Sequence, residues 1–183
     1  MGLFNFSKKK KSTPIKDMIW MSQSAKQNGC LKFIKEQPDV VVAVWFNETE
    51  EVFNQFLNQQ NGFRVEIQHA KSMHSSQVSE KNLVFLEHYP LREKEEEVIA
   101  NLNPKQVYVF SSLDEPLFNQ FGGGKIVDLM KNLGMKEDEM IEHPMISKSI
   151  ESAQHKLAQK VTIENSANSA KEWFIRNLGE DIK

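Results

Sequence analysis

Apolar and polar positions along the chain follow two different periods. Residues 39–46, 83–86 and 107–110 are nearly continuous apolar runs of strand length, and residues 63–69 alternate apolar with polar side chains. Continuous runs are typical of strands buried on both faces of a parallel sheet, whereas alternation indicates a half-buried strand. The pattern therefore predicts four strands.

Helical spacing fills the intervals between these strands and the chain after the last one. Apolar side chains three or four residues apart occur in five ranges: 48–60, 91–102, 125–133, 147–159 and 166–178. Gly134 is a helix stop signal, and Pro144 fits the first turn of a helix. Residues 16–35 have the same spacing with an interruption at Asn28-Gly29, which predicts two short helices or one kinked helix. Residues 72–80 are polar and predict a loop or a weak helix. Strands alternating with helices predict an α/β fold with a parallel sheet of about four strands and a helical C-terminal extension.

Composition narrows the class of protein. The chain has 183 residues, 23 basic and 25 acidic side chains, and a formal net charge of −2. This balance argues against nucleic acid as a partner, because nucleic-acid binding needs a basic face. Cys30 is the single cysteine, so an internal disulfide is excluded and a reducing cytoplasm is the expected location. No apolar run approaches the ~20 residues of a transmembrane helix.

The N-terminal residues allow two interpretations. Leu3, Phe4 and Phe6 precede four consecutive lysines (Lys8, Lys9, Lys10 and Lys11), a combination suited to weak contact with an anionic membrane surface. The alternative, which we favour, is a disordered basic tail over residues 1–15. A secretory signal has its charges before its apolar residues, so this order argues against export. Phe6 stands where the myristoylation pattern needs Ser or Thr.

Two stretches resemble a known family. SSLDEPLFNQFGG at 111–123 and EHPMISKSIESAQ at 142–154 are similar to the point where the second motor domain of SecA, the ATP-driven motor of bacterial protein export, meets its helical scaffold. The resemblance is strong over 107–160 and thin over 31–101. It implies a RecA-like, helicase C-terminal-like sheet of the P-loop NTPase type. It also implies a degenerate α/β domain at 16–135, followed by a helical extension at 136–183.

The motor chemistry of that family is missing from the sequence. A motor domain of this kind uses a Gly-Arg-x-Gly-Arg run, whose guanidinium groups stabilise charge on the transferring phosphate. The three arginines, Arg64, Arg92 and Arg176, lie in no such run. We therefore expect a chain that is not an enzyme, with no catalytic residue and no cofactor.

A glycine-rich turn keeps a second class of function open. Gly122, Gly123 and Gly124 precede Lys125, which suggests a phosphate-binding nest. The Walker pattern needs wider glycine spacing and Ser or Thr after the lysine, and here Ile126 follows it. We favour a turn between two helices, and the alternative is a small nucleotide-binding hydrolase.

Other candidate chemistry is sparse. The five histidines have no standard metal-ligand spacing, so we expect no metal site. Cys30 has no neighbouring His or Asp that would mark a nucleophile, which predicts a structural thiol. The acidic run at 93–97 predicts a solvated helix face or an acidic docking patch.

The C-terminal helices carry the candidate partner-binding residues. An apolar stripe on the helix at 147–159 and the apolar end of the last helix both need a cover. We favour a helix hairpin, in which the last helix folds back and buries this stripe. The alternative is that a partner protein buries it. The candidates for contact with that partner are Ile146, Ile150, Leu157, Trp173 and Phe174. We expect a non-catalytic SecA-like protein-binding or scaffold module, linked to export through translocase components, and a role unrelated to export is the other possibility.

Overall fold

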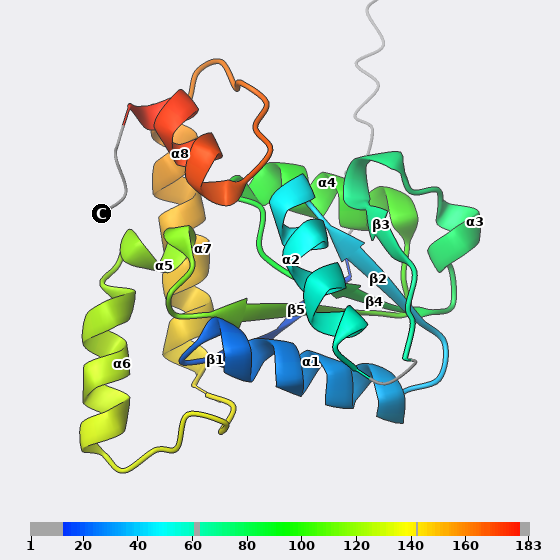
Figure 1. Ribbon diagram of the computed structural model, residues 1–183. Helices are drawn as coiled ribbons and strands as arrows, with labels where there is room; N and C mark the ends of the chain where they lie inside the picture. The colour runs from blue at the N-terminus through cyan, green and yellow to red at the C-terminus, as the bar shows by residue number, and fades with distance from the viewer. Residues whose placement is uncertain (1–12, 61–62, 142, 180–183) are drawn as a thin grey trace, which may run out of the picture.

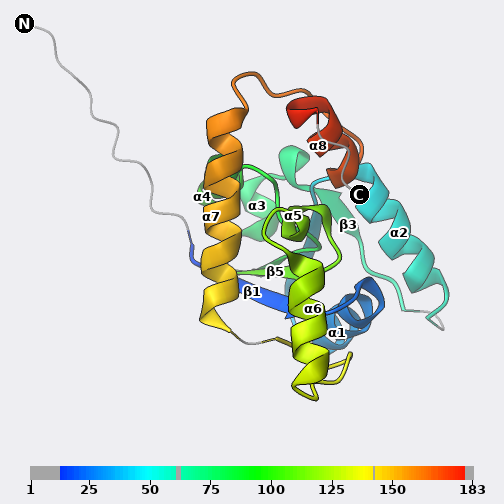
Figure 2. The same ribbon diagram turned by 90° about the vertical axis from the view of Figure 1, so that its left-hand side faces the viewer.

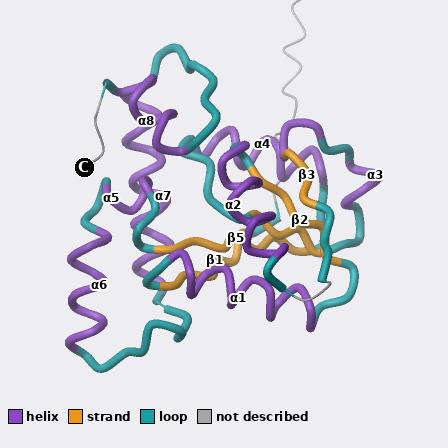
Figure 3. The backbone as a smooth tube through the Cα atoms, in the orientation of Figure 1, coloured by secondary structure: helices purple, strands orange, loops and turns teal. Residues whose placement is uncertain are grey.

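The computed structural model describes residues 13–60, 63–141 and 143–179. Its centre is a five-stranded parallel sheet in the order β1-β5-β4-β2-β3 (Figures 1 and 3). The strands are β1 (Ile15–Trp20), β2 (Val40–Val44), β3 (Ile67–His69), β4 (Asn82–Phe85) and β5 (Gln106–Ser112). The predicted α/β class is confirmed, with one strand more than the pattern indicated.

Helices cover both faces of the sheet. They are α1 (Gln23–Glu36), α2 (Asn47–Asn58), α3 (Ser75–Val78), α4 (Arg92–Leu102), α5 (Pro116–Asn119), α6 (Gly123–Asn132), α7 (Pro144–Lys160) and α8 (Ala170–Leu178), with a 3₁₀ turn, η1, at Ala70–Ser72. Helices α1 and α2 lie on one side of the sheet and α7 on the other (Figure 2). Side chains of α1 and α2 belong to one hydrophobic cluster, and those of α4, α5, α7 and α8 belong to the other. None of these helices is long and apolar enough to cross a membrane.

The first strand is where the sequence prediction was wrong. Residues 15–20 form β1, which pairs in parallel with β5 from Ile15 opposite Val107 to Trp20 opposite Ser112. Both faces of β1 are covered, because Ile19 belongs to one hydrophobic cluster and Trp20 to the other. A strand covered on both faces has apolar residues at odd and even positions alike, so it loses the alternation that would mark it as a strand.

The predicted interruption at Asn28-Gly29 is also wrong, because α1 runs through it without a break. Gly29 serves packing instead. A Cβ at this position would lie 2.3 Å from Cζ2 of Trp20, far inside van der Waals contact. The glycine therefore lets α1 approach the end of β1 more closely than any other residue would allow.

The other boundaries differ by smaller amounts. Only residues 67–69 of the predicted strand at 63–69 pair with β2, and residues 61–62 lie outside the described ranges.

Gly134 has a φ of 84° directly after the C-cap of α6, as expected of a helix stop. Of the predicted tail, residues 1–12 are likewise not described and Ile15 opens β1. The division into domains stays a prediction.

The last helix covers the core in a different way from the predicted hairpin. The apolar stripe of α7 is buried in the core, and α7 packs against α4 and α5. Helix α8 packs against α5 rather than along α7, and Figure 2 shows the two helices separated. Trp173 also donates a 2.8 Å hydrogen bond from Nε1 to Glu164 Oε1 in the preceding loop. The C-terminal helices therefore complete the core of the sheet domain.

Candidate functional site

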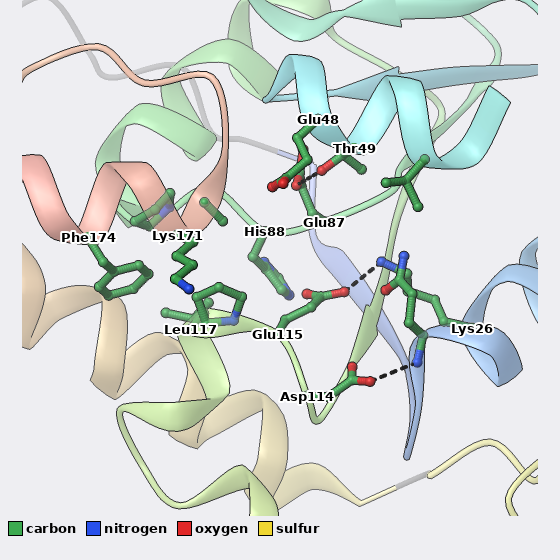
Figure 4. Close-up of a pocket in the computed structure, with 15 residues that line it drawn as sticks. Lys26, Glu48, Thr49, Glu87, His88, Asp114, Glu115, Leu117, Lys171 and Phe174 are labelled. Atoms are coloured by element: carbon green, nitrogen blue, oxygen red, sulfur yellow. Dashed lines mark hydrogen bonds and ion pairs between the residues drawn. The ribbon is translucent and has the colours of Figure 1, made fainter. Parts of the chain in front are cut away.

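A pocket of about 330 Å³ opens at the carboxyl edge of the sheet (Figure 4). Its walls come from the first turns of α1 and α2, the chain after β4 and β5, and the start of α8. In open parallel sheets this edge is where ligands bind. The charged side chains that line it are Lys26, Glu48, Glu87, Asp114, Glu115 and Lys171, with His88 behind them.

Lys26 is buried in the pocket wall and already has partners. Its side chain is 3% exposed, and its Nζ lies 2.6 Å from Glu115 Oε1. The same ammonium donates a 2.9 Å hydrogen bond to the carbonyl oxygen of Leu86, and Glu115 accepts a hydrogen bond from the backbone N–H of Ser112. The ion pair therefore links α1 to the ends of β4 and β5, and its charge is already neutralised.

Glu87 occupies the N-terminus of α2. The backbone N–H groups of Trp45 and Phe46 donate to its Oε1 at 2.9 and 3.1 Å, and the hydroxyl of Thr49 donates to its Oε2. Burial, opposed in part by the hydrogen bond from Thr49 and the charge of Lys26, raises the pKa of Glu87 to about 7. A helix N-terminus is a common anion site. Here that position is filled by a carboxylate of the chain itself.

The N-terminus of α1 is satisfied in the same way. Asp114 accepts a 3.1 Å hydrogen bond from the backbone N–H of Gln23, the first residue of the helix. Ser22 caps the helix by accepting from the N–H of Ala25. The N-termini of α1 and α2 therefore both hold carboxyl groups where a bound phosphate would need donors.

A second buried polar cluster lies behind the pocket and joins three parts of the fold. His88 contacts Glu95 through Nδ1 at 3.0 Å and Asp17 through Nε2 at 3.2 Å. Gln154 on α7 donates from Nε2 to Glu95 Oε2 and to the carbonyl oxygen of Tyr89. Burial favours the neutral ring, but Glu95 and Asp17 outweigh it and raise the pKa of His88 to about 10. The charged imidazole thus links β1 to α4, and Gln154 joins α7 to the same cluster through Glu95.

This cluster changes the interpretation of the acidic run at 93–97. Glu95 is fully buried, so the run is not a uniformly solvated face. Arg92 pairs with Glu96 at 2.8 Å and with Glu151 of α7 at 3.3 Å. Part of the run therefore serves the packing of α4 against α7.

The predicted partner-binding residues lie inside the chain's own core. They share one hydrophobic cluster and are all buried: Ile146, Ile150, Leu157, Trp173 and Phe174. Phe174 also lines the pocket. A partner would reach most of these side chains only if α7 or α8 moved, so their predicted role in partner binding stays a prediction.

The glycine turn at 122–125 has a packing role. Gly122 has a φ of 84° and caps α6, and a Cβ on Gly123 would lie 2.3 Å from the carbonyl oxygen of Leu113. Close packing therefore requires glycine at 123.

The two remaining candidates from the sequence are the thiol of Cys30 and a metal site. Cys30 is buried, and burial raises the pKa of its thiol, which disfavours the nucleophilic thiolate. Within the described ranges, no three His, Cys, Asp or Glu side chains are grouped so as to hold a metal ion.

Sequence reasoning missed the residues that build the pocket. It singled out none of the four charged residues that pair or cap there: Lys26, Glu87, Asp114 and Glu115. A usable signal was present, because Glu87 follows β4 after one residue and Asp114 follows β5 after one residue. The carboxyl ends of parallel strands meet at one edge of the sheet, which brings such residues together.

Comparison with known proteins finds one recurring relative. The protein translocase subunit SecA of Acidithiobacillus ferrooxidans is 47% identical over 58 residues, which cover 32% of this chain and 6% of the relative. SecA of Psychrobacter sp. is 45% identical over 58 residues, and SecA of Ehrlichia canis is 51% identical over 51 residues. The chain therefore contains a SecA-like segment.

The similarity covers only a small part of each relative. The Ehrlichia canis match covers 28% of this chain and 6% of the relative. No protein-family model matches the chain. The similarity to SecA is thus partial, and the chain spans about 6% of the length of the relatives it matches.

Proposed function

We propose that this chain is a non-catalytic protein-binding module related to SecA that acts in protein translocation. The proposal combines the SecA-like segment with a single observation at the pocket. The N-termini of α1 and α2, which both face it, are occupied by the carboxyl groups of Asp114 and Glu87. A nucleotide phosphate placed there would meet carboxyl oxygens instead of free N–H donors.

The other groups at the pocket support the same conclusion. Lys26 is engaged by Glu115 at 2.6 Å and would have to give up this partner to bind phosphate. Removing one partner of a buried ion pair costs about 3–5 kcal/mol, which a phosphate contact would first have to offset. Gly123 is explained by close packing against Leu113, so the glycine turn needs no ligand to account for it.

Affinity capture from the source cells tests the link to translocation. With the full chain immobilised, we expect translocase subunits among the captured proteins, in the cytoplasmic fraction where we propose that the module acts. Capture that yields no translocase subunit would contradict the proposed role. Recovery of the chain itself from another fraction would contradict the proposed location.

Nucleotide binding tests the non-catalytic half of the proposal. We expect a fluorescent ATP analogue to show no magnesium-dependent binding and the purified chain to hydrolyse ATP no faster than the buffer. Saturable binding that disappears in Lys125→Ala would instead favour a small nucleotide-binding hydrolase. Lys171→Ala, a lysine at the pocket, serves as the matched control.

A further inference from the structure

A second concave surface lies between the α5–α6 turn and the outer side of α7. It has a volume of about 390 Å³. Apolar atoms of Phe121, Met145 and Leu157 contribute to its floor, and Lys148, Lys156 and Lys160 line it along α7. No residue of α6 itself lines it, and we call it the α6–α7 groove because it lies between the turn that leads into α6 and helix α7. It lies away from the carboxyl-edge pocket and has no lining residue in common with it.

Exposed apolar side chains lie on α6 and at the start of α7. Leu129 is 53% exposed and Leu133 72% exposed on α6, and Met145 at the start of α7 is 68% exposed. These are three of the six large hydrophobic residues that are exposed in the described part of the chain. Figures 1 and 2 show α6 as an outlying helix beside α7, and its main neighbour is the short helix α5. Leu129 and Leu133 are four positions apart on α6, and neighbouring exposed apolar groups of this kind mark an interaction surface.

The charge of the groove indicates the chemistry of its occupant. None of the described residues that line it is acidic, whereas three are lysines from one helix. Complementary charge at the rim of an apolar contact selects the partner and speeds association. The occupant should therefore combine apolar side chains with carboxylates.

We propose that the α6–α7 groove binds an acidic amphipathic helix of a partner protein. The apolar side chains of this helix pack against Leu129, Leu133 and Met145, and its carboxylates face Lys148 and Lys156. An amphipathic helix laid into a groove between helices is an established recognition mode. This inference deepens the proposed function and rests on it, because it names the surface and the class of partner.

Two other occupants fit the groove less well. A membrane surface is planar and suits a convex apolar face, whereas this surface is concave and carries its lysines along one wall. The chain's own N-terminal segment has four consecutive lysines, Lys8, Lys9, Lys10 and Lys11, so it has the same charge as the groove.

Fluorescence anisotropy with the full chain tests the proposal. The probe is a labelled synthetic helix of about 18 residues with leucines on one face and glutamates on the other. A second probe replaces every glutamate with lysine. We expect the acidic probe to bind at least about tenfold more tightly than the basic one, with an affinity that falls as salt rises. Equal binding of the two probes would overturn the proposal.

Variants place the binding at the groove. The pair Lys148→Glu and Lys156→Glu, and the pair Leu129→Ser and Leu133→Ser, should each weaken binding of the acidic probe by at least about tenfold. Matched controls are Lys32→Glu and Ile163→Ser, at an exposed lysine and an exposed isoleucine elsewhere. Circular dichroism confirms folding of each variant. Loss of binding in the controls, or none in the paired variants, would contradict the assignment.

The remaining outcomes separate this inference from the proposed function. Lysine-dependent binding to phosphatidylglycerol vesicles without binding of the acidic probe would identify a membrane site instead, and a groove-dependent dimer in sedimentation would identify a second copy. If the probe binds as expected and no translocase subunit is captured, the groove inference holds and the link to translocation fails. If both paired variants capture translocase subunits as well as the wild type, the module binds elsewhere and the groove inference fails.

Discussion

Because Gly29 lies so close to Trp20, we expect Gly29→Ala to destabilise the protein, although helix propensity alone predicts that it would stabilise it. Alanine is favoured over glycine inside a helix by about 1 kcal/mol, so Gly29→Ala in the middle of α1 would stabilise an isolated helix. In the folded chain the new Cβ would lie 2.3 Å from one indole atom and 2.6 Å from another. Steric overlap of this kind in a packed core costs about 1–3 kcal/mol or more.

The surroundings of Trp20 decide which effect is larger. Its ring stacks on Phe110 with centroids 5.3 Å apart and planes 18° apart, and it is 5% exposed. The indole therefore has little room to move away from a new methyl group. We expect Gly29→Ala to destabilise the protein by about 1–2 kcal/mol after its gain in helix propensity is subtracted.

Urea unfolding followed by circular dichroism measures this change against two controls. Gly124→Ala in α6 has no atom within 4 Å of the new Cβ, so it should be neutral or stabilise by up to about 1 kcal/mol. In a Trp20→Leu background the obstruction is removed, so adding Gly29→Ala should cost much less than in the wild type. The reasoning is refuted if Gly29→Ala is as favourable as Gly124→Ala, or if its cost is unchanged in the Trp20→Leu background.

Three further predictions follow from the pocket and the C-terminal helix. Lys26→Met should destabilise the chain by about 3 kcal/mol in urea unfolding, since it leaves Glu115 without its counterion, and a cost below about 1 kcal/mol would mean that the pair is solvated. Burial raises the pKa of Glu87 from 4.5 to about 7. The folded state therefore holds this proton more tightly than the unfolded chain, and stability declines as pH rises through that window. Glu87→Gln should be more stable than the wild type by up to about 3 kcal/mol near pH ~8 and lose this advantage near pH ~4.5, and a constant difference across pH would contradict it. Deleting the residues after Asn165 removes Trp173 from the core, so the truncated chain should lose at least about 3 kcal/mol and bind a hydrophobic dye, whereas unchanged stability would show that α8 is dispensable.

Most of the sheet could be predicted from the sequence, because its central strands are short apolar runs bounded by turn signals. β2, β4 and β5 all lie within one or two residues of the predicted ranges, and α4 and α7 follow their apolar spacing. The end of α6 at Gly134 could also be predicted from the sequence, because helices often end at a residue with a left-handed φ, which favours glycine. These features depend on local preferences that act within a few residues of the chain.

The edge strand β1 and the pocket could not be predicted in the same way. Ile19 and Trp20 face opposite sides of the sheet, so their spacing alone fits a helix as well as a strand. Pairing with β5, about 90 residues further along the chain, decides between the two. Propensity is a weak guide where such long-range pairing sets the structure.

The sequence by itself determined the order of strands and helices from β2 to β5, the near-neutral charge and the absence of the arginine run of a motor. The tertiary structure alone decided which charges are buried. Lys26 and Glu115 are 89 positions apart, and Glu87 caps a helix that begins 40 positions earlier in the chain. The physical reason is that burial and ion pairing depend on distance in space, which the fold sets and the local pattern of residues does not encode.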